Sequence, residues 1–530
     1  MTRALCVLGT LLFTLSCNGT EEPVDLEMIE KIRDEGFNRS QVMESVRVLS
    51  DEIGSRLTAS PGMRAASKWS VEQLKDWGIE KAYLEPFEFG RGWSMTRGEV
   101  HMTSPRQAQL HALPIEWFPG TDGVIEGEII YAPVSDVEDF ARWRGKLAGK
   151  MVLIDEVSEP APRETKIYAP YTIEELDELA EIGDPVDIAN AEESWLESVT
   201  FERQTTLFAQ QEGALAIIRG NSSGNMALNN QSNEYHAGRT PTIPSVAIAR
   251  EHYERLIRLA EHGNEVRLSL DVEVEFYDDD HNGYNTIAEI PGDGSSSQIV
   301  MAGAHIDTRS PGDGAADNAA GVAVVMEALR ILKALEVEPP RTIRLGLWSG
   351  EEQEYFGSAR HVRSHFGHYP RISGEPHDLF GDYEAADLSK PIVKADGYED
   401  LSVYFNYDNG AGKVRGIYTE GNEAVVPIFE AWLAPFHDLD ATHVSLNHTT
   451  YTDHESFELI GLPGFQFIQD RTIGNGGAHT QLDMFDETYE EDLKQASVIM
   501  ASFLYHAAMR EERMPRLSEP TPINDNSKDE

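Results

Sequence analysis

Five acidic or imidazole side chains stand close together in this sequence, each where the secondary structure is expected to change. They are His305, Asp307, Asp317, Glu351 and Glu352. Carboxylates and imidazoles without cysteine are typical ligands of a hard or borderline divalent metal ion, zinc first. Each short pattern alone is common in proteins, but their succession within one structural unit predicts a metal site.

The elements that carry these residues predict a β-α-β unit. Residues 299–302 form a short apolar run, typical of a buried strand that ends just before His305. From residue 318 the apolar side chains recur at helical spacing, so Asp317 stands at the mouth of a helix, where an acid is also a plausible cap. Residues 342–348 form a second apolar run, with the Glu-Glu pair on the loop beyond it. Because ligands in open α/β sheets bind at the carboxyl ends of strands, these side chains are expected to converge.

A pair of zinc ions needs more ligands than this stretch supplies. Asp408 ends a predicted strand, although an Asp before Asn-Gly is also typical of a turn. His479 follows the apolar strand 464–468 and a glycine-rich loop, with Asp483 close behind as a candidate orienting group. His454 precedes a helix and is expected to line the pocket or cap that helix. The other late histidines, His443 and His448, are interpreted as surface or core residues.

Composition limits the domain count and the partners. The chain has 530 residues, too many for one ordinary domain, so two or three are expected. Its 44 Lys and Arg against 91 Asp and Glu give a net charge of −47. Such a field repels nucleic acids and anionic membrane surfaces, which argues against them as partners, and it attracts cations.

The N-terminus predicts export. Arg3 and the apolar residues 4–15 form a signal segment that is too short to span a bilayer. Residues 15–17 resemble the end of a bacterial lipobox, although Thr14 stands where such boxes usually carry leucine. A lipidated Cys17 would tether the protein to a membrane, periplasmic or outer-membrane; the alternative is an ordinary cleaved signal and a secreted protein. The two cysteines, Cys6 and Cys17, belong to this segment, so the mature part has no disulfide and no thiol nucleophile.

The expected architecture is an α/β/α sandwich on a mixed, mainly parallel sheet, interrupted by a separate β-rich domain. The predicted segments are a signal peptide over 1–17, a first part of the main domain over 24–115, an inserted domain over 116–276, a second part with the metal site over 284–510, and a disordered tail over 511–530. The tail is rich in Pro, Glu, Asp and Ser, a composition typical of disorder.

Taken in order, His-x-Asp, Asp, Glu-Glu, Asp and His resembles a known family. It is similar to the co-catalytic dizinc exopeptidases, which include bacterial leucyl aminopeptidase, plasma glutamate carboxypeptidase and the transferrin-receptor-like peptidases. The resemblance covers about 284–509, with the segments WSGEEQ, TDHESF and GLPGFQFIQD, and GSRLTASPG near the N-terminus fits too. The insert, with KLAGKMVLID, FAQQEGALAIIRG and TIPSVAIAR, resembles a protease-associated domain.

The resemblance implies a metal role for five residues. Asp317 would bridge two zinc ions, His305 and Asp408 would complete one site, and Glu352 and His479 would complete the other. Other divalent metals are the alternative to zinc.

The resemblance also implies roles around the metals. Glu351 would be the general base, and Asp307 would hold the ring of His305 by a hydrogen bond. Candidates for the substrate pocket are His454, Asp453, Tyr451 and Arg309. Tyr451 stands at a different offset from the tyrosine that the aminopeptidases offer to the oxyanion, so no oxyanion donor is assigned.

The expected activity is that of an exported aminopeptidase acting on peptides, because the acidic pocket favours a cationic amine. A carboxypeptidase or dipeptidase is the alternative, and Arg309 or Arg471 would then bind the substrate carboxylate. Acylases and deacetylases usually separate the first His and the bridging Asp by more than the 12 residues found here. A receptor-like pseudoenzyme would lack ligands, and none is missing. Side-chain specificity and oligomeric state are not encoded in these patterns.

Overall fold

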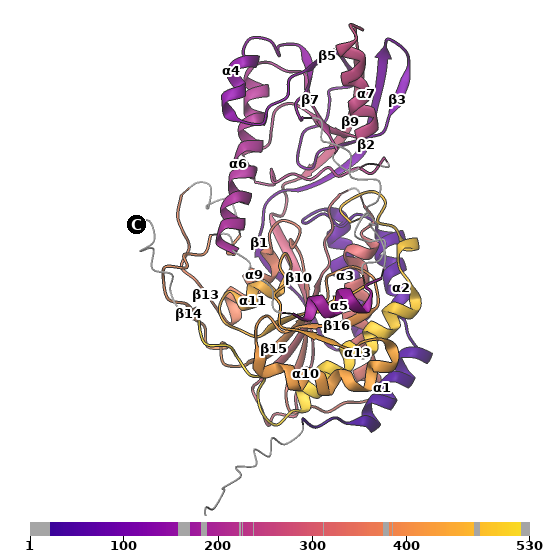
Figure 1. Cartoon of the computed structure of the whole chain (residues 1–530), viewed down its shortest axis with the longest axis vertical. Helices are drawn as coiled ribbons and strands as arrows, with labels where there is room; N and C mark the ends of the chain where they lie inside the picture. Colours follow the sequence, from indigo (N-terminus) through magenta and orange to yellow (C-terminus); the bar gives the residue numbers. More distant parts are fainter. Residues whose placement is uncertain are drawn as a thin grey trace, which may run out of the picture.

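A computed structural model describes residues 22–156, 170–181, 188–221, 224, 226–236, 238–310, 312–374, 381–383, 385–470 and 478–520. The predicted signal segment with Cys17 lies outside the described residues, as does Arg471. Within the described residues the chain forms two units, each built on an eight-stranded sheet (Figure 1). In that part of the chain, every helix is too short or too polar to serve as a membrane span.

The sheet of the first unit has four parallel strands at its centre. In spatial order its strands are β1 (Lys81–Glu88), β10 (Asn282–Ile290), β12 (Thr342–Trp348), β11 (Ile299–His305), β15 (Leu401–Asn406), β18 (Gly464–Gln469), β16 (Val414–Tyr418) and β17 (His443–Ser445). Strands β12, β11, β15 and β18 run parallel, whereas β1 and β10 on one side and β16 on the other pair antiparallel with their inner neighbours. The carboxyl ends of four adjacent strands therefore meet at one edge of the sheet.

Helices cover both faces of this sheet. One face carries α1 (Leu26–Asn38), α2 (Val42–Arg47), α3 (Pro61–Asp76), α8 (Ala320–Ala334), α10 (Val426–Leu433) and α13 (Glu490–Met509). The other face carries α9 (Phe356–His365) and α11 (His454–Glu458). Alternation along β11 serves both layers, since Val300 and Ala302 pack with the first group and Met301 with the second. The predicted α/β/α sandwich with a mixed sheet is confirmed.

The second unit has its own sheet and core. Its strands, in spatial order, are β3 (Ala108–Leu110), β2 (Gly92–Ser104), β9 (Arg267–Tyr277), β5 (Ile125–Tyr131), β6 (Lys150–Leu153), β7 (Ala216–Gly220), β8 (Ser245–Ile248) and β4 (Ala112–Pro114), accompanied by the helices α4 (Phe140–Trp143), α6 (Ile188–Gln211) and α7 (Arg250–Glu261). Figure 1 shows this unit above the first. Two apolar clusters, one on each face of the sheet, hold it together.

The predicted boundary of the insert at residue 116 is wrong. The second sheet already includes β2, β3 and β4, so it begins at Gly92. Strand β2 enters the unit and pairs antiparallel with β9, which leaves it, from Gly92 opposite Tyr277 to Ser104 opposite Arg267. The unit is inserted between β1 and β10, and its first and last long strands pair with each other. Because β2 belongs to this pair, the unit begins at Gly92 and not at residue 116.

Helix α5 (Ile173–Ala180) also departs from the predicted insert. Although residues 116–276 were expected to form one separate domain, α5 lies against the first unit (Figure 1). The buried side chain of Leu176 packs with Tyr418 and Ile468 of the first sheet. The physical reason is that α5 is amphipathic, and its buried apolar side chain packs against apolar side chains of β16 and β18.

The predicted disordered tail is wrong for residues 511–520. Met514 is buried against the main core. Arg513 binds the Glu399 carboxylate at 2.8 Å, and the Arg516 guanidinium donates to the carbonyl oxygen of Leu401 at 2.7 Å. One buried methionine and two anchored arginines order a segment whose composition alone is polar. Residues 521–530 lie outside the described part of the chain.

A close approach at the start of α8 generates a stability prediction. A Cβ on Gly321 would lie 2.3 Å from Asn318 Oδ1 and 2.4 Å from the carbonyl oxygen of Tyr407. Gly321→Ala should therefore lower the free energy of unfolding by about 1–3 kcal/mol, the range for overpacking a tight site. Thermal unfolding measures this, with Gly224→Ala as the control because its Cβ would meet nothing closer than 3.9 Å. Equal melting temperatures for the two variants would contradict the prediction.

Candidate metal centre

The predicted ligands meet at the carboxyl edge of the four central strands. His305 is the last residue of β11, and Asp408 follows the end of β15. Glu352 stands on the loop after β12, and His479 lies beyond the end of β18. Asp317 comes just before α8. Five ligands distant in sequence thus reach one place because each follows or precedes an element of the same α/β unit.

Asp317 lies between two groups of ligands. Its Oδ1 is 3.0 Å from His305 Nε2, and its Oδ2 is 3.1 Å from His479 Nε2. Asp408 Oδ1 lies 3.2 Å from the same nitrogen of His305, whereas Glu352 Oε2 lies 3.1 Å from the same nitrogen of His479. One carboxylate therefore joins a His-Asp pair to a His-Glu pair, which is the division that the resemblance implies.

The electrostatics of this cluster favour cations. Burial alone lowers the pKa of His305, but Asp408 and the other carboxylates outweigh it and raise that pKa well above its usual value. Glu352, followed by Asp317, likewise raises the pKa of His479. Buried carboxylates are stable only beside compensating positive charge. Two imidazoles and three carboxylates with this spacing fit the donor set of two zinc ions.

Glu351 and Glu352 face different partners although they are neighbours. Glu351 offers a carboxylate oxygen to the group formed with His305 and Asp408, and Glu352 faces His479. Burial, reinforced by nearby carboxylates, raises the pKa of Glu351 well above its usual value. A carboxyl group with a raised pKa is a stronger base than an ordinary glutamate, which suits proton transfer.

The backbone carbonyl group of Asp307 faces the ring of His305. His305 Nδ1 lies 3.1 Å from the backbone carbonyl oxygen of Asp307, and 3.6 Å from Oδ1 of its carboxylate. That carboxylate instead accepts hydrogen bonds from Thr58 Oγ1 at 3.0 Å and from the backbone N–H of Glu351 at 3.3 Å. Asp307 thus ties the His305 strand end to the Glu351 loop. Thr58, in the GSRLTASPG segment, was not predicted to take part.

Asp483 orients Asp317 rather than His479. Its two carboxylate oxygens accept from the backbone N–H groups of Ala316 at 2.7 Å and Asp317 at 2.9 Å. Burial raises the pKa of Asp483 to about 7, and the neighbouring Asp317 adds to this shift. The position of Asp317 therefore depends on a second, buried carboxylate.

Arg309 faces Glu352, not an open substrate pocket. Its backbone N–H and its Nε donate to the two oxygens of Glu352 at 3.1 and 3.2 Å. Its Nη1 lies 3.5 Å from Glu116, which is fully buried and also accepts from the backbone N–H of Ser310 at 2.7 Å. Burial raises the pKa of Glu116 to about 7. Nothing in the local sequence marks Glu116 for this position.

The three pocket candidates near residue 452 lie in different surroundings. Tyr451 is 75% exposed. Asp453 is fully buried, and burial, with Asp408 nearby, raises its pKa well above its usual value. His454 begins α11, where its Nε2 lies 3.2 Å from the carbonyl oxygen of Thr449. Of the three, Asp453 lies in the electrostatic field of the metal ligands most directly.

Comparisons with known proteins identify the unit that holds these residues. Residues 285–504 match the model of Peptidase family M28. This matched segment contains all five predicted metal ligands, so the M28 likeness falls on the part of the chain that builds the cluster.

The likeness to known proteins extends beyond the segment that matches the M28 model. Human carboxypeptidase Q is 25% identical over 484 residues, which span 91% of this chain and 88% of that protein. An M28 peptidase precursor from Shewanella amazonensis superposes with a TM-score of 0.64 at 20% identity, over 94% of this chain and 99% of that one. BSAP, a zinc aminopeptidase from Bacillus subtilis, gives 0.58 at 17% identity, over 89% and 96%. The two structures show that the fold is shared.

The contact between Asp483 and Asp317 generates a second prediction. Asp483→Ala leaves the backbone N–H groups of Ala316 and Asp317 without an acceptor, which should cost about 1–3 kcal/mol of stability and weaken metal binding by the predicted ligands. Asp483→Asn keeps an acceptor oxygen in nearly the same volume, so its loss of bound zinc should be smaller. Zinc content and thermal unfolding of the purified variants measure both effects. Equal zinc content in the alanine variant and the unsubstituted protein would contradict the role of Asp483.

Proposed function

We propose that this chain is an exported, zinc-dependent exopeptidase that removes residues from the free N-terminus of peptides. The observation that carries the proposal is the placement of Asp317, with one oxygen 3.0 Å from His305 and the other 3.1 Å from His479. This geometry suits two metal ions that share one carboxylate, with Glu351 beside them. The M28 match over residues 285–504 supports the same chemistry.

The residues of the chain have separate tasks in peptide hydrolysis. His305 and Asp408 would hold one zinc ion, Glu352 and His479 the other, and Asp317 both. Two zinc ions supply Lewis acidity, which polarises a carbonyl group and makes a bound water molecule acidic.

Proton transfer falls to a carboxyl group that is not itself a ligand. Glu351 accepts the proton of the attacking water and passes it to the leaving amine. Its buried position suits the task, because burial raises the pKa of the Glu351 carboxyl group and so makes it a stronger base. Asp307 accepts from the Glu351 backbone and so fixes the loop on which the base stands.

The preference for an N-terminus is supported by the charges around the ligands. Arg309 already pairs with Glu352 and Glu116, so its charge is committed. Glu351 and Asp453 remain beside the ligands as further carboxyl groups. Arg309 therefore offers no free positive charge to a substrate carboxylate, which favours the N-terminal end of a peptide. The zinc aminopeptidase fold of BSAP is consistent with this preference.

A carboxypeptidase is the second candidate. The likeness to human carboxypeptidase Q runs along 91% of this chain, farther than the M28 domain alone. A substrate carboxylate would then need a cation other than Arg309, and Arg471, directly after Asp470 beyond β18, is the candidate. A dipeptidase on the same scaffold would need a similar cation.

Further features of the proposal concern location and partners. Residues 1–17 would direct export to the periplasm, to a membrane-anchored lipoprotein through Cys17, or to the medium. The second unit would be a protease-associated domain, as its KLAGKMVLID and TIPSVAIAR segments suggest. Peptides would be the partners, and the net charge of −47 argues against nucleic acid.

A screen with blocked peptides tests the direction of cleavage. Short peptides with both ends free and peptides with an amidated C-terminus should be hydrolysed, whereas N-acetylated peptides should not. A chelator should abolish the reaction, because the metal ligands alone do not activate water. Cleavage of the N-acetylated set with rejection of the amidated set would move the protein to the carboxypeptidase side, and Arg471→Ala would then be the first variant to assay.

Substitutions of the two adjacent glutamates should have different effects on activity and on zinc content. Glu351→Gln should lower kcat by at least about 10²-fold with zinc content unchanged, because a general base is lost and no ligand is removed. Glu352→Gln should instead lose bound zinc, since it removes a ligand of the cluster. Elemental analysis and steady-state kinetics of both variants make the comparison. Equal loss of zinc in both would show that the division of roles is mistaken.

A further inference from the structure

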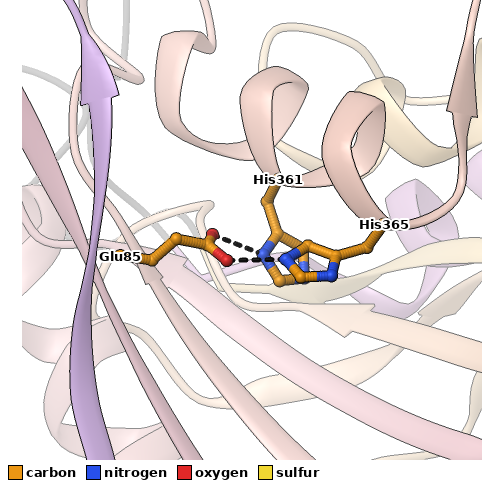
Figure 2. A group of neighbouring side chains, drawn as sticks. All are labelled: Glu85, His361 and His365. Atoms are coloured by element: carbon orange, nitrogen blue, oxygen red, sulfur yellow. Dashed lines mark hydrogen bonds and ion pairs between the residues drawn. The ribbon is translucent and has the colours of Figure 1, made fainter.

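A second group of metal-ligand side chains lies outside the M28 centre. Glu85 projects from β1, the edge strand of the first sheet, toward His361 and His365 on α9 (Figure 2). The two histidines are four residues apart, so one helical face presents both rings. Their ring centroids are 4.4 Å apart.

The carboxylate of Glu85 contacts both histidine rings. Glu85 Oε2 lies 2.7 Å from His361 Nδ1, and Glu85 Oε1 lies 2.6 Å from His365 Nε2. One ligand atom from each of the three residues falls within 4.8 Å of the other two. Asn285 on β10 supports Glu85, because its Nδ2 lies 3.5 Å from Glu85 Oε2 and donates to the carbonyl oxygen of Gly357 at 2.9 Å. The three ligand atoms therefore need little movement to surround a single ion.

One side of this group is buried and the other side is exposed to solvent. The side chain of His361 is 0% exposed and packs on the rings of Trp348 and Phe366. The His365 side chain is 38% exposed and that of Glu85 is 20% exposed, so solvent reaches the group. A fixed imidazole beside two accessible ligands is the arrangement that lets an ion enter without unfolding the site.

The buried ring of His361 has one polar neighbour, the Glu85 carboxylate, which its Nδ1 faces. Within the described residues its Nε2 makes no hydrogen bond, so Glu85 is the only hydrogen-bond partner of this ring there.

We propose that Glu85, His361 and His365 bind one zinc ion, separate from the ions of the M28 centre. Two imidazoles and one carboxylate form a ligand set that zinc takes up in proteins, with water or another group as the fourth ligand. The ion would fasten the edge strand β1 to α9, the helix that follows the loop of Glu351 and Glu352. The expected effect of the ion is to hold β1 and α9 together, since its ligands come from both elements.

The competing interpretation is a hydrogen-bonded bridge without metal, in which one carboxylate accepts from two histidines. Zinc content separates the two. The full-length protein, purified and equilibrated with zinc, should hold one more ion per chain than His365→Ala, measured by elemental analysis. His365 is partly exposed, so this variant should fold. His437→Ala, a matched change at an exposed histidine, should retain the full zinc content.

The position of the ion completes the test. Anomalous scattering at the zinc edge should show a peak among Glu85, His361 and His365 that disappears in His365→Ala and in Glu85→Gln. The peaks at the M28 ligands should remain, so failure of this proposal and failure of the proposed peptidase are distinguishable. Equal zinc content in His365→Ala and the unsubstituted protein, or an additional peak found instead at Glu420, His448 and Glu458, would overturn the proposal.

Discussion

The carboxylate of Asp317 is the contact on which the metal centre depends. Each of its oxygens faces a different histidine, at 3.0 Å from His305 Nε2 and 3.1 Å from His479 Nε2. The two ligand groups therefore contact the same carboxylate. Its position is fixed from behind, where Asp483 accepts from its backbone N–H at 2.9 Å. Helix α8 begins at Ala320 and packs against both the sheet and α13. A displacement of Asp317 would therefore disturb both ligand groups together.

The second unit supports this centre from two sides. Glu116 lies near Arg309, which in turn holds Glu352. Gln481, two residues after His479, accepts from the backbone N–H of Leu228 at 2.7 Å and donates to the carbonyl oxygen of Met226 at 2.9 Å. The first contact reaches Glu352 through Arg309, and the second holds the segment that carries His479. The unit that interrupts the main sheet is thus also part of the scaffold that positions the metal ligands.

Much of the centre could be predicted because its signals are local. Apolar periodicity located β11, α8 and β12, and the rule that parallel strands present ligands at their carboxyl ends placed His305, Asp317 and the Glu-Glu pair together. Asp408 and His479 followed from the same rule applied to β15 and β18. The roles assigned to these residues stay predictions, whereas the α/β/α architecture around them is confirmed.

Only the tertiary structure decided which distant groups support those ligands. Glu116 meets Arg309 across 193 residues, and Thr58 meets Asp307 across 249, separations that no periodic pattern records. The boundary at Gly92 followed from the pairing of β2 with β9, and the order of residues 511–520 from the burial of Met514. Local sequence determines which elements form and which side chains stand at their ends. The partner of a buried charge is set by packing between elements, because burial makes an uncompensated charge too costly to leave alone.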